Sequence, residues 1–239
     1  MRAYAKLFIK GFFRSLLKNH RHARGTSQAL DIYMDESFAK LLEQWGNGTV
    51  WNEIQIFLAD REGNVLDLAC GTGRVYDFLR DNVSLDYYGC DISALLIEKA
   101  VKRGIDRERL CVGDATKLEY RDNQFDYLFS IGSLEHFTEE GIRTTLKECR
   151  RVCSGITFHM MPVSRSGFDE GWVTSVQSYW HNSERWWLQI FREVYGDSVW
   201  TMRSAWSDRT LFGNWFVTAH PMFFTRKKLG AIVVDRPKI

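Results

Sequence analysis

Apolar and polar positions change their spacing at about residue 64. Beyond it, short continuous apolar runs predict buried strands at residues 65–68, 86–90, 109–112, 125–131 and 155–160. Stretches with helical spacing lie between them, the longest at residues 138–152. Strands that alternate with helices predict an α/β fold with a doubly wound, mostly parallel sheet and helices on both faces.

The part before residue 64 has helical patterns only. Residues 35–45 and 50–59 both show them. A chain of 239 residues is long enough to bury one sizeable core and a small appended part. We therefore expect N-terminal helices over residues 1–60 and one domain over residues 61–239.

After Pro162 the regular alternation ends in a tryptophan-rich insert, residues 163–195. Its large aromatic residues are Trp172, Tyr179, Trp180, Trp186, Trp187 and Phe191. We expect the insert to cover the carboxyl ends of the strands as a lid or wall, or to pack as a hydrophobic flap. Two more strands are predicted at residues 199–206 and 215–224, with a turn at residues 213–214. They bring the predicted sheet to about seven strands.

The first 30 residues differ from the rest in charge. They hold seven Lys or Arg and no acid, which leaves 25 bases against 30 acids in the remaining chain. Basic residues recur at every fourth position from Arg2 to Lys18, and aromatic or aliphatic residues follow the other side. This pattern predicts an amphipathic basic helix. It either packs on its own domain or makes a peripheral membrane contact through residues 1–24.

The rest of the composition is ordinary for a globular protein, with 45% apolar and 26% charged residues. The sequence contains no run of 18 or more apolar residues, so it predicts no membrane-spanning helix. The five cysteines are an odd number without metal-ligand spacing, so we expect reduced thiols and no metal site. A cytoplasmic location follows as an expectation, with the inner membrane face as the place of any peripheral contact.

The stretch NVLDLACGTGR, residues 64–74, predicts a strand that runs into a glycine-rich turn. It lacks the third glycine of a dinucleotide fingerprint and the Lys-Ser or Lys-Thr of a phosphate loop. Asp67 stands inside the strand, where a carboxylate would repel a pyrophosphate. The turn therefore predicts a ligand that is neutral or cationic at this point.

Two more acids follow strands. Asp91 ends the second strand, and Asp114 follows the third. The carboxyl ends of the strands of a doubly wound sheet meet at one crevice. There a carboxylate can accept hydrogen bonds from both hydroxyls of a ribose, and Asp114 with Ala115 can read the edge of an adenine.

Taken in order, these motifs resemble those of the Rossmann-like (class I) S-adenosylmethionine-dependent methyltransferases over about residues 35–160. The resemblance implies a Rossmann-like sheet, the cofactor S-adenosyl-L-methionine and methyl transfer. It implies that Asp67 lies near the ammonium or sulfonium end, that Asp91 holds the ribose and that Ile92 packs on adenine. The cofactor-binding residues implied are Asp67, Ala69, Gly71, Gly73, Asp91, Ile92, Asp114, Ala115 and Ser130.

The loop after the fourth strand, Ser133-Leu134-Glu135-His136, is where the transferred methyl group should point. A hydroxyl acceptor needs a base, and a histidine of near-neutral pKa suits that role. His136 is therefore the first catalytic candidate and Glu135 the second, and His159 at the end of the fifth strand is the third. The alternative is that Glu135 and His136 simply begin the next helix.

The expected function is methyl transfer to oxygen or nitrogen of a small molecule, such as a sugar, ring or lipid-linked metabolite. A second interpretation rests on SIGSLEHF and His159, which resemble the cyclopropane-fatty-acid and mycolic-acid methyltransferases and imply carbon methylation of a lipid. A third is a partner protein that binds the nucleoside without catalysis. Nucleic acid is not an expected substrate, because the chain beyond residue 30 is net acidic.

Overall fold

The computed structural model describes residues 28, 30–45, 49–59, 61–81, 84–174, 177–203 and 212–219. The predicted basic helix within residues 1–24 lies outside the described residues, as does the end of the strand predicted at residues 215–224. Among the described helices, none has both the length and the apolar character needed to cross a membrane.

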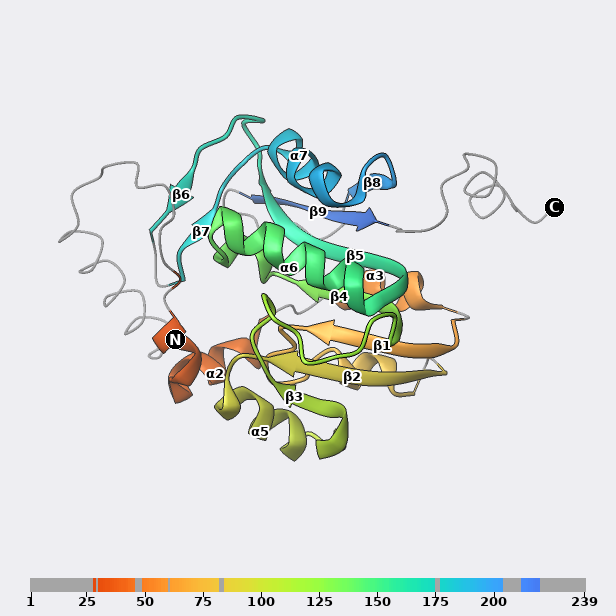
Figure 1. Cartoon of the computed structure of the whole chain (residues 1–239). Coiled ribbons are helices and arrows are strands. Elements are labelled where there is room, and N and C mark those ends of the chain that lie inside the picture. The colour runs from red at the N-terminus through yellow and green to blue at the C-terminus, as the bar shows by residue number, and fades with distance from the viewer. Residues whose placement is uncertain are drawn as a thin grey trace, which may run out of the picture.

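A seven-stranded sheet in the order β3-β2-β1-β4-β5-β9-β8 forms the centre of the fold (Figure 1). Its strands are β1 (Gly63–Leu68), β2 (Leu85–Asp91), β3 (Leu110–Val112), β4 (Phe125–Ile131), β5 (Cys153–Ser164), β8 (Val199–Arg203) and β9 (Phe212–Ala219). The first five are parallel, while β9 pairs antiparallel with β5 and with β8. The predicted mostly parallel, Rossmann-like sheet of about seven strands is confirmed.

Helices cover both faces of this sheet (Figure 1). The helical elements are η1 (Leu30–Met34), α2 (Glu36–Leu42), α3 (Thr49–Leu58), α4 (Tyr76–Leu79), α5 (Ala94–Lys102), η2 (Arg107–Arg109), η3 (Leu134–His136), α6 (Glu139–Val152) and α7 (Glu184–Tyr195). Neighbouring strand residues face opposite layers: Val65 packs with α3, α4 and α5, whereas Leu66 packs with α6. The alternation follows from the period of two in a strand, and it gives the sheet a core on each side.

The predicted end of the fifth strand and the predicted turn at residues 213–214 are both wrong. Strand β5 continues to Ser164, and Gly213 and Asn214 lie inside β9, opposite Val163 and Pro162. Pro162 is tolerated because β4 ends at Ile131, opposite Met160, so this part of β5 has a neighbour on one side only. A proline without an N–H therefore leaves no bond unmade toward β4.

The tryptophan-rich insert forms a hydrophobic layer beside β5. It contains the short strands β6 (Trp172–Val173) and β7 (Tyr179–Trp180) and the helix α7. Trp180, Trp187 and Phe191 are buried together with Ile142 and Leu146 of α6. The expected hydrophobic flap is therefore present, and among the described residues of the insert only Gln177 and Tyr179 reach the cavity described below.

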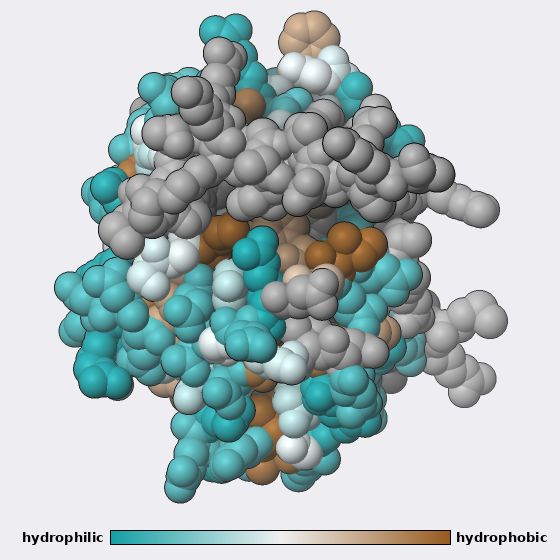
Figure 2. All heavy atoms as spheres, turned by 90° about the vertical axis from the view of Figure 1, so that its right-hand side faces the viewer, coloured by the Kyte–Doolittle hydropathy of each residue, from teal (hydrophilic) through white to brown (hydrophobic). Residues whose placement is uncertain are grey.

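Figure 2 shows the face at which the parallel strands begin. Its described side chains are mainly hydrophilic, with small apolar groups between them. The opposite face, where the strands end, is the one that carries the candidate site.

Candidate functional site

A cavity of about 460 Å³ opens at the carboxyl ends of the parallel strands. The loops after β1, β2, β3 and β4 form one side of it, and η1 and α2 form the other. Its size and mixed apolar and polar lining are typical of small-molecule sites, and its position is where α/β sheets bind ligands. Most of the predicted site residues line it: Asp67, Ala69, Gly71, Asp91, Ile92, Asp114, Ala115, Glu135 and His136.

Asp91 joins two of the loops that line the cavity. Its Oδ2 accepts a hydrogen bond from the Gly71 N–H at 2.9 Å, and its Oδ1 accepts one from the Ser93 N–H at 2.9 Å. Burial raises the pKa of Asp91 to about 6, against the effect of these backbone donors. Each carboxylate oxygen has a second lone pair, so Asp91 can still accept two hydrogen bonds from a ligand.

The glycine-rich turn brings backbone close to the cavity. Ala69 and Gly71 both have φ 57°, a left-handed conformation that a residue with a side chain seldom adopts. Gly73, with φ 71°, serves another purpose: a Cβ there would collide with Ile105 and approach Ala100 of α5. Gly73 is outside the cavity lining and permits close packing of the turn on the helix.

Asp67 is 98% buried and lines the cavity below this turn. The Tyr87 hydroxyl donates a hydrogen bond to its Oδ2 at 2.7 Å. Burial nevertheless raises the pKa of Asp67 to about 8, so the carboxyl is largely protonated at neutral pH unless a cation comes close. The arrangement suits the neutral or cationic ligand that the sequence predicts at this point.

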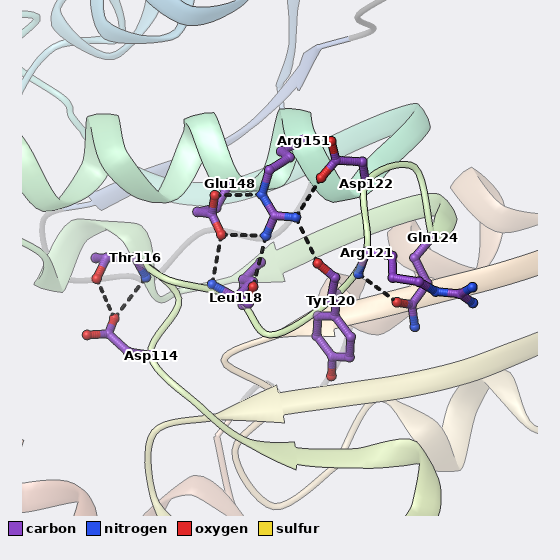
Figure 3. Close-up of polar contacts among 9 residues, drawn as sticks. All are labelled: Asp114, Thr116, Leu118, Tyr120, Arg121, Asp122, Gln124, Glu148 and Arg151. Atoms are coloured by element: carbon purple, nitrogen blue, oxygen red, sulfur yellow. Dashed lines mark hydrogen bonds and ion pairs between the residues drawn. The ribbon is translucent and has the colours of Figure 1, made fainter.

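The Asp114 loop is held from the side by α6 (Figure 3). Asp114 Oδ1 accepts from both the N–H and the hydroxyl of Thr116 at 2.8 Å, which leaves its Oδ2 for a ligand. Further along, Arg151 donates from Nη2 to the Leu118 carbonyl at 2.8 Å and from Nη1 to the Tyr120 carbonyl at 2.7 Å. The two bonds fix the stretch that follows the predicted adenine contact.

Glu148, one turn before Arg151 on α6, also holds this loop, and we call the two residues the clamp. Its Oε2 accepts from the Leu118 N–H at 2.8 Å and pairs with Arg151 at 2.7 Å. Sequence reasoning missed both residues. The spacing of three in a helix was visible, but the loop that such a pair would hold was not, because it lies about 30 residues away in the chain.

Glu135 and His136 stand side by side at the other end of the cavity. Glu135 is 94% buried, and burial raises the pKa of its carboxyl to about 8. His136 Nδ1 lies 2.8 Å from the Ser178 carbonyl oxygen, which can only accept, so Nδ1 carries the proton. Its Nε2 lies 3.7 Å from Glu135 Oε1, with its lone pair available.

Burial lowers the pKa of His136 to about 4. The near-neutral pKa expected from the sequence is therefore corrected, because a side chain removed from water is costly to protonate. His136 is neutral at pH 7, as a base must be before it takes a proton.

Ser130 and His159 do not reach the cavity. Ser130 Oγ and His159 Nδ1 lie 2.8 Å apart between β4 and β5, where the two residues are neighbours in the register. His159 is fully buried against Phe191 of α7, and burial lowers its pKa to about 3. Both side chains belong to the packed layer behind the cavity.

Several wall residues are not among the site residues predicted from the sequence. Tyr33 of η1 and Gln177 of the insert meet across the cavity, where Gln177 Nε2 donates to the Tyr33 hydroxyl at 2.9 Å. Burial and the nearby acids Asp91 and Glu135 raise the pKa of Tyr33 to about 12. Trp45, just after α2, also lines the cavity. Within the described part of the chain, no cluster of three potential metal ligands occurs.

Comparisons with known proteins show similarity to methyltransferases. Residues 65–155 match a family described as a methyltransferase domain. A Mus musculus protein named as a probable tRNA methyltransferase 9B is 36% identical over 105 residues, which is 43% of this chain and 22% of that protein. The demethylmenaquinone methyltransferase of Thermotoga maritima is 36% identical over 111 residues, 45% of this chain and 47% of that enzyme.

The chain thus spans from about a fifth to about half the length of these curated relatives. Among solved structures, the Burkholderia thailandensis 1,6-didemethyltoxoflavin-N1-methyltransferase aligns with a TM-score of 0.61 and 17% identity, over 76% of this chain and 82% of that one. At 17% identity, this structural similarity is evidence for the fold alone. Together with the family match, it confirms the resemblance predicted from the sequence.

Proposed function

We propose, on the basis of the class I methyltransferase domain that residues 65–155 form, that the protein transfers a methyl group from S-adenosyl-L-methionine to oxygen or nitrogen of a small molecule. One observation carries the proposal: a single cavity joins the Asp91 and Asp114 loops to the Glu135 and His136 pair. A nucleoside cofactor at one end would point its reacting group toward the other.

The described residues fit this cofactor. The ribose has Asp91 as an acceptor, and the adenine has the apolar Ile92 and Ala115 beside the open Oδ2 of Asp114. The buried acid Asp67 offers a negative charge to the ammonium or the sulfonium. The Burkholderia structure was solved with S-adenosylhomocysteine and a small ring compound, 1,6-didemethyltoxoflavin. When bound, the cofactor would supply an electrophilic methyl group.

The chain's own part in the reaction is to orient the acceptor and remove a proton. His136 is held in one tautomer by the Ser178 carbonyl, so its Nε2 is the atom that takes the proton. Tyr33, Gln177 and Tyr179 line the same cavity and would help to position the acceptor. Positioning of this kind is the main requirement of a methyl transfer by direct displacement.

Carbon methylation of a lipid is not favoured by this geometry. That interpretation pairs Glu135 with His159, and His159 lies in the packed layer, hydrogen-bonded to Ser130. The name of the Mus musculus relative refers to tRNA, but this chain covers only 22% of that protein, so the name does not define the acceptor here.

The first prediction tests the cofactor site. Asp91→Ala removes an ionised acceptor and should weaken S-adenosylhomocysteine binding by about 1.5–3 kcal/mol, or roughly 10–150-fold. Calorimetry on the full chain measures the change. Asp86→Ala, on the same strand but exposed and paired with Arg109 at 2.9 Å, is the matched control and should bind normally. Equal affinity in wild type and a folded Asp91→Ala protein would remove Asp91 from the site.

A further inference from the structure

The charges around the cavity are unevenly distributed. Among the described lining residues, four are acids, Asp67, Asp91, Asp114 and Glu135, and Arg74 is the single Lys or Arg. Arg74 lies on the turn after β1 and donates from Nη1 to the Glu43 carbonyl at the end of α2. Asp91 and Asp114 lie at the cofactor end, so among these four acids Glu135 is the one that faces the acceptor, and it disfavours a carboxylate or phosphate next to the reacting atom.

The acceptor end also holds two buried polar atoms without a hydrogen-bond partner in the described part of the chain. These are Glu135 Oε2 and Ser133 Oγ, from side chains that are 94% and 92% buried. Both residues line the cavity and both lie on the loop after β4. An unsatisfied buried oxygen is costly, and a ligand that brings two hydrogen-bond donors would satisfy both of these atoms.

An aromatic ring lies beside this carboxylate. Gly132, with φ 62°, separates them: a Cβ there would lie 3.3 Å from Trp45 Cη2 and 3.6 Å from Glu135 Oε1. Tyr33 provides a second ring near Glu135, whose charge contributes to the raised pKa of Tyr33. A carboxylate flanked by aromatic rings is a common arrangement around an ammonium group.

From these three observations we infer that the methyl acceptor is an amine that enters as an ammonium ion, with Glu135 as its ionic partner. The inference deepens the proposed function and rests on it. An ammonium supplies the donors for Glu135 Oε2 and Ser133 Oγ and a proton for His136 Nε2. A hydroxyl acceptor has one donor, so it would leave one of these two oxygens without a partner.

The reaction balances with these groups alone. His136 Nε2 takes one proton from the ammonium and becomes an imidazolium, which frees the nitrogen lone pair. The nitrogen then forms a bond to the methyl carbon as the carbon–sulfur bond breaks, and the sulfur keeps that electron pair. The product is a methylated ammonium ion. Glu135 faces a positive charge before and after the step, which lowers the cost of placing an ammonium beside a sulfonium.

The test uses the full chain loaded with S-adenosylhomocysteine and three probes that carry the same phenyl ring: benzylamine, benzyl alcohol and benzoate. Calorimetry at neutral pH should show benzylamine binding about tenfold or more tightly than either of the others. Glu135→Gln should remove this preference. Glu140→Gln, an exposed acid in the first turn of α6, should keep it.

Each outcome decides one question. Failure of S-adenosylhomocysteine to bind would overturn the proposed function and this inference with it. Normal cofactor binding with no preference for benzylamine in wild type would overturn the inference alone, and so would a preference that survives in a folded Glu135→Gln protein. The wild-type comparison needs no variant, so the test stands even if Glu135→Gln does not fold.

Discussion

Asp67 is a residue whose ionisation opposes folding. Its pKa is raised to about 8 in the folded chain from an ordinary value near 3.8. Between these two pH values the folded state binds more protons than the unfolded state. The free energy of unfolding therefore falls as the pH rises from about 4 to 8, and this loss is absent below about pH 4.

Asp67→Asn should remove this dependence, because an amide cannot ionise and its oxygen can still accept from Tyr87. The variant should gain more than about 1 kcal/mol over wild type at pH 8 relative to pH 5. Denaturant unfolding at the two pH values measures the difference. Asp86→Asn, exposed at the start of β2, should show no such gain, and a wild-type slope in Asp67→Asn would contradict the prediction.

Site residues that follow the ends of strands could be predicted from the sequence, whereas residues on the opposite wall of the cavity could not. Asp91, Asp114 and Glu135 could be found because the ends of parallel strands meet at one edge of the sheet. Tyr33 and Trp45 could not, because their place depends on how η1 and α2 dock, and no local pattern encodes that contact.

Among the elements, α6 both covers the sheet and holds the Asp114 loop. Arg151→Lys would lose the planar group that binds the Leu118 and Tyr120 carbonyls together. S-adenosylhomocysteine affinity should then fall by about 3–10-fold, as expected for one weakened contact. Hydrogen exchange of residues 114–122 should rise in parallel, as measured by mass spectrometry.

Lys147→Met is the control for this clamp, since Lys147 is an exposed residue of the same helix. Unchanged exchange in the loop of Arg151→Lys would show that Glu148 holds it alone. A fall in affinity without faster exchange would show that Arg151 acts by charge and does not position the loop.

Helix α7 shows where element prediction from the sequence failed and why. Its apolar residues at 187, 190, 191, 194 and 195 have helical spacing, and Ser183 caps it by accepting from the Trp186 N–H at 3.2 Å. This helical spacing is present in the sequence, but the many tryptophans of the insert obscured it. By contrast, the five parallel strands were predicted because each is a short apolar run with a break on both sides.

For the molecule as a whole, the basic segment at residues 1–24 stays a prediction of membrane contact. If the contact exists, the full chain should bind vesicles of anionic lipid at low salt, and removal of residues 1–24 should abolish that binding. S-adenosylhomocysteine binding should survive, because every described cavity residue lies beyond this segment. Sedimentation with anionic and neutral vesicles measures both proteins, and a full chain that ignores anionic vesicles would refute the contact.

The strand order β5-β9-β8 has a consequence for how the chain folds as it leaves the ribosome. Strand β8 is synthesised before β9 but lies outside it, so β9 must pair with β5 and β8 together. Until residue 219 has emerged, β5 has an open edge along residues 157–164, and β8 has no strand to pair with. A nascent chain that ends before residue 219 is thus exposed to edge-to-edge aggregation along this edge.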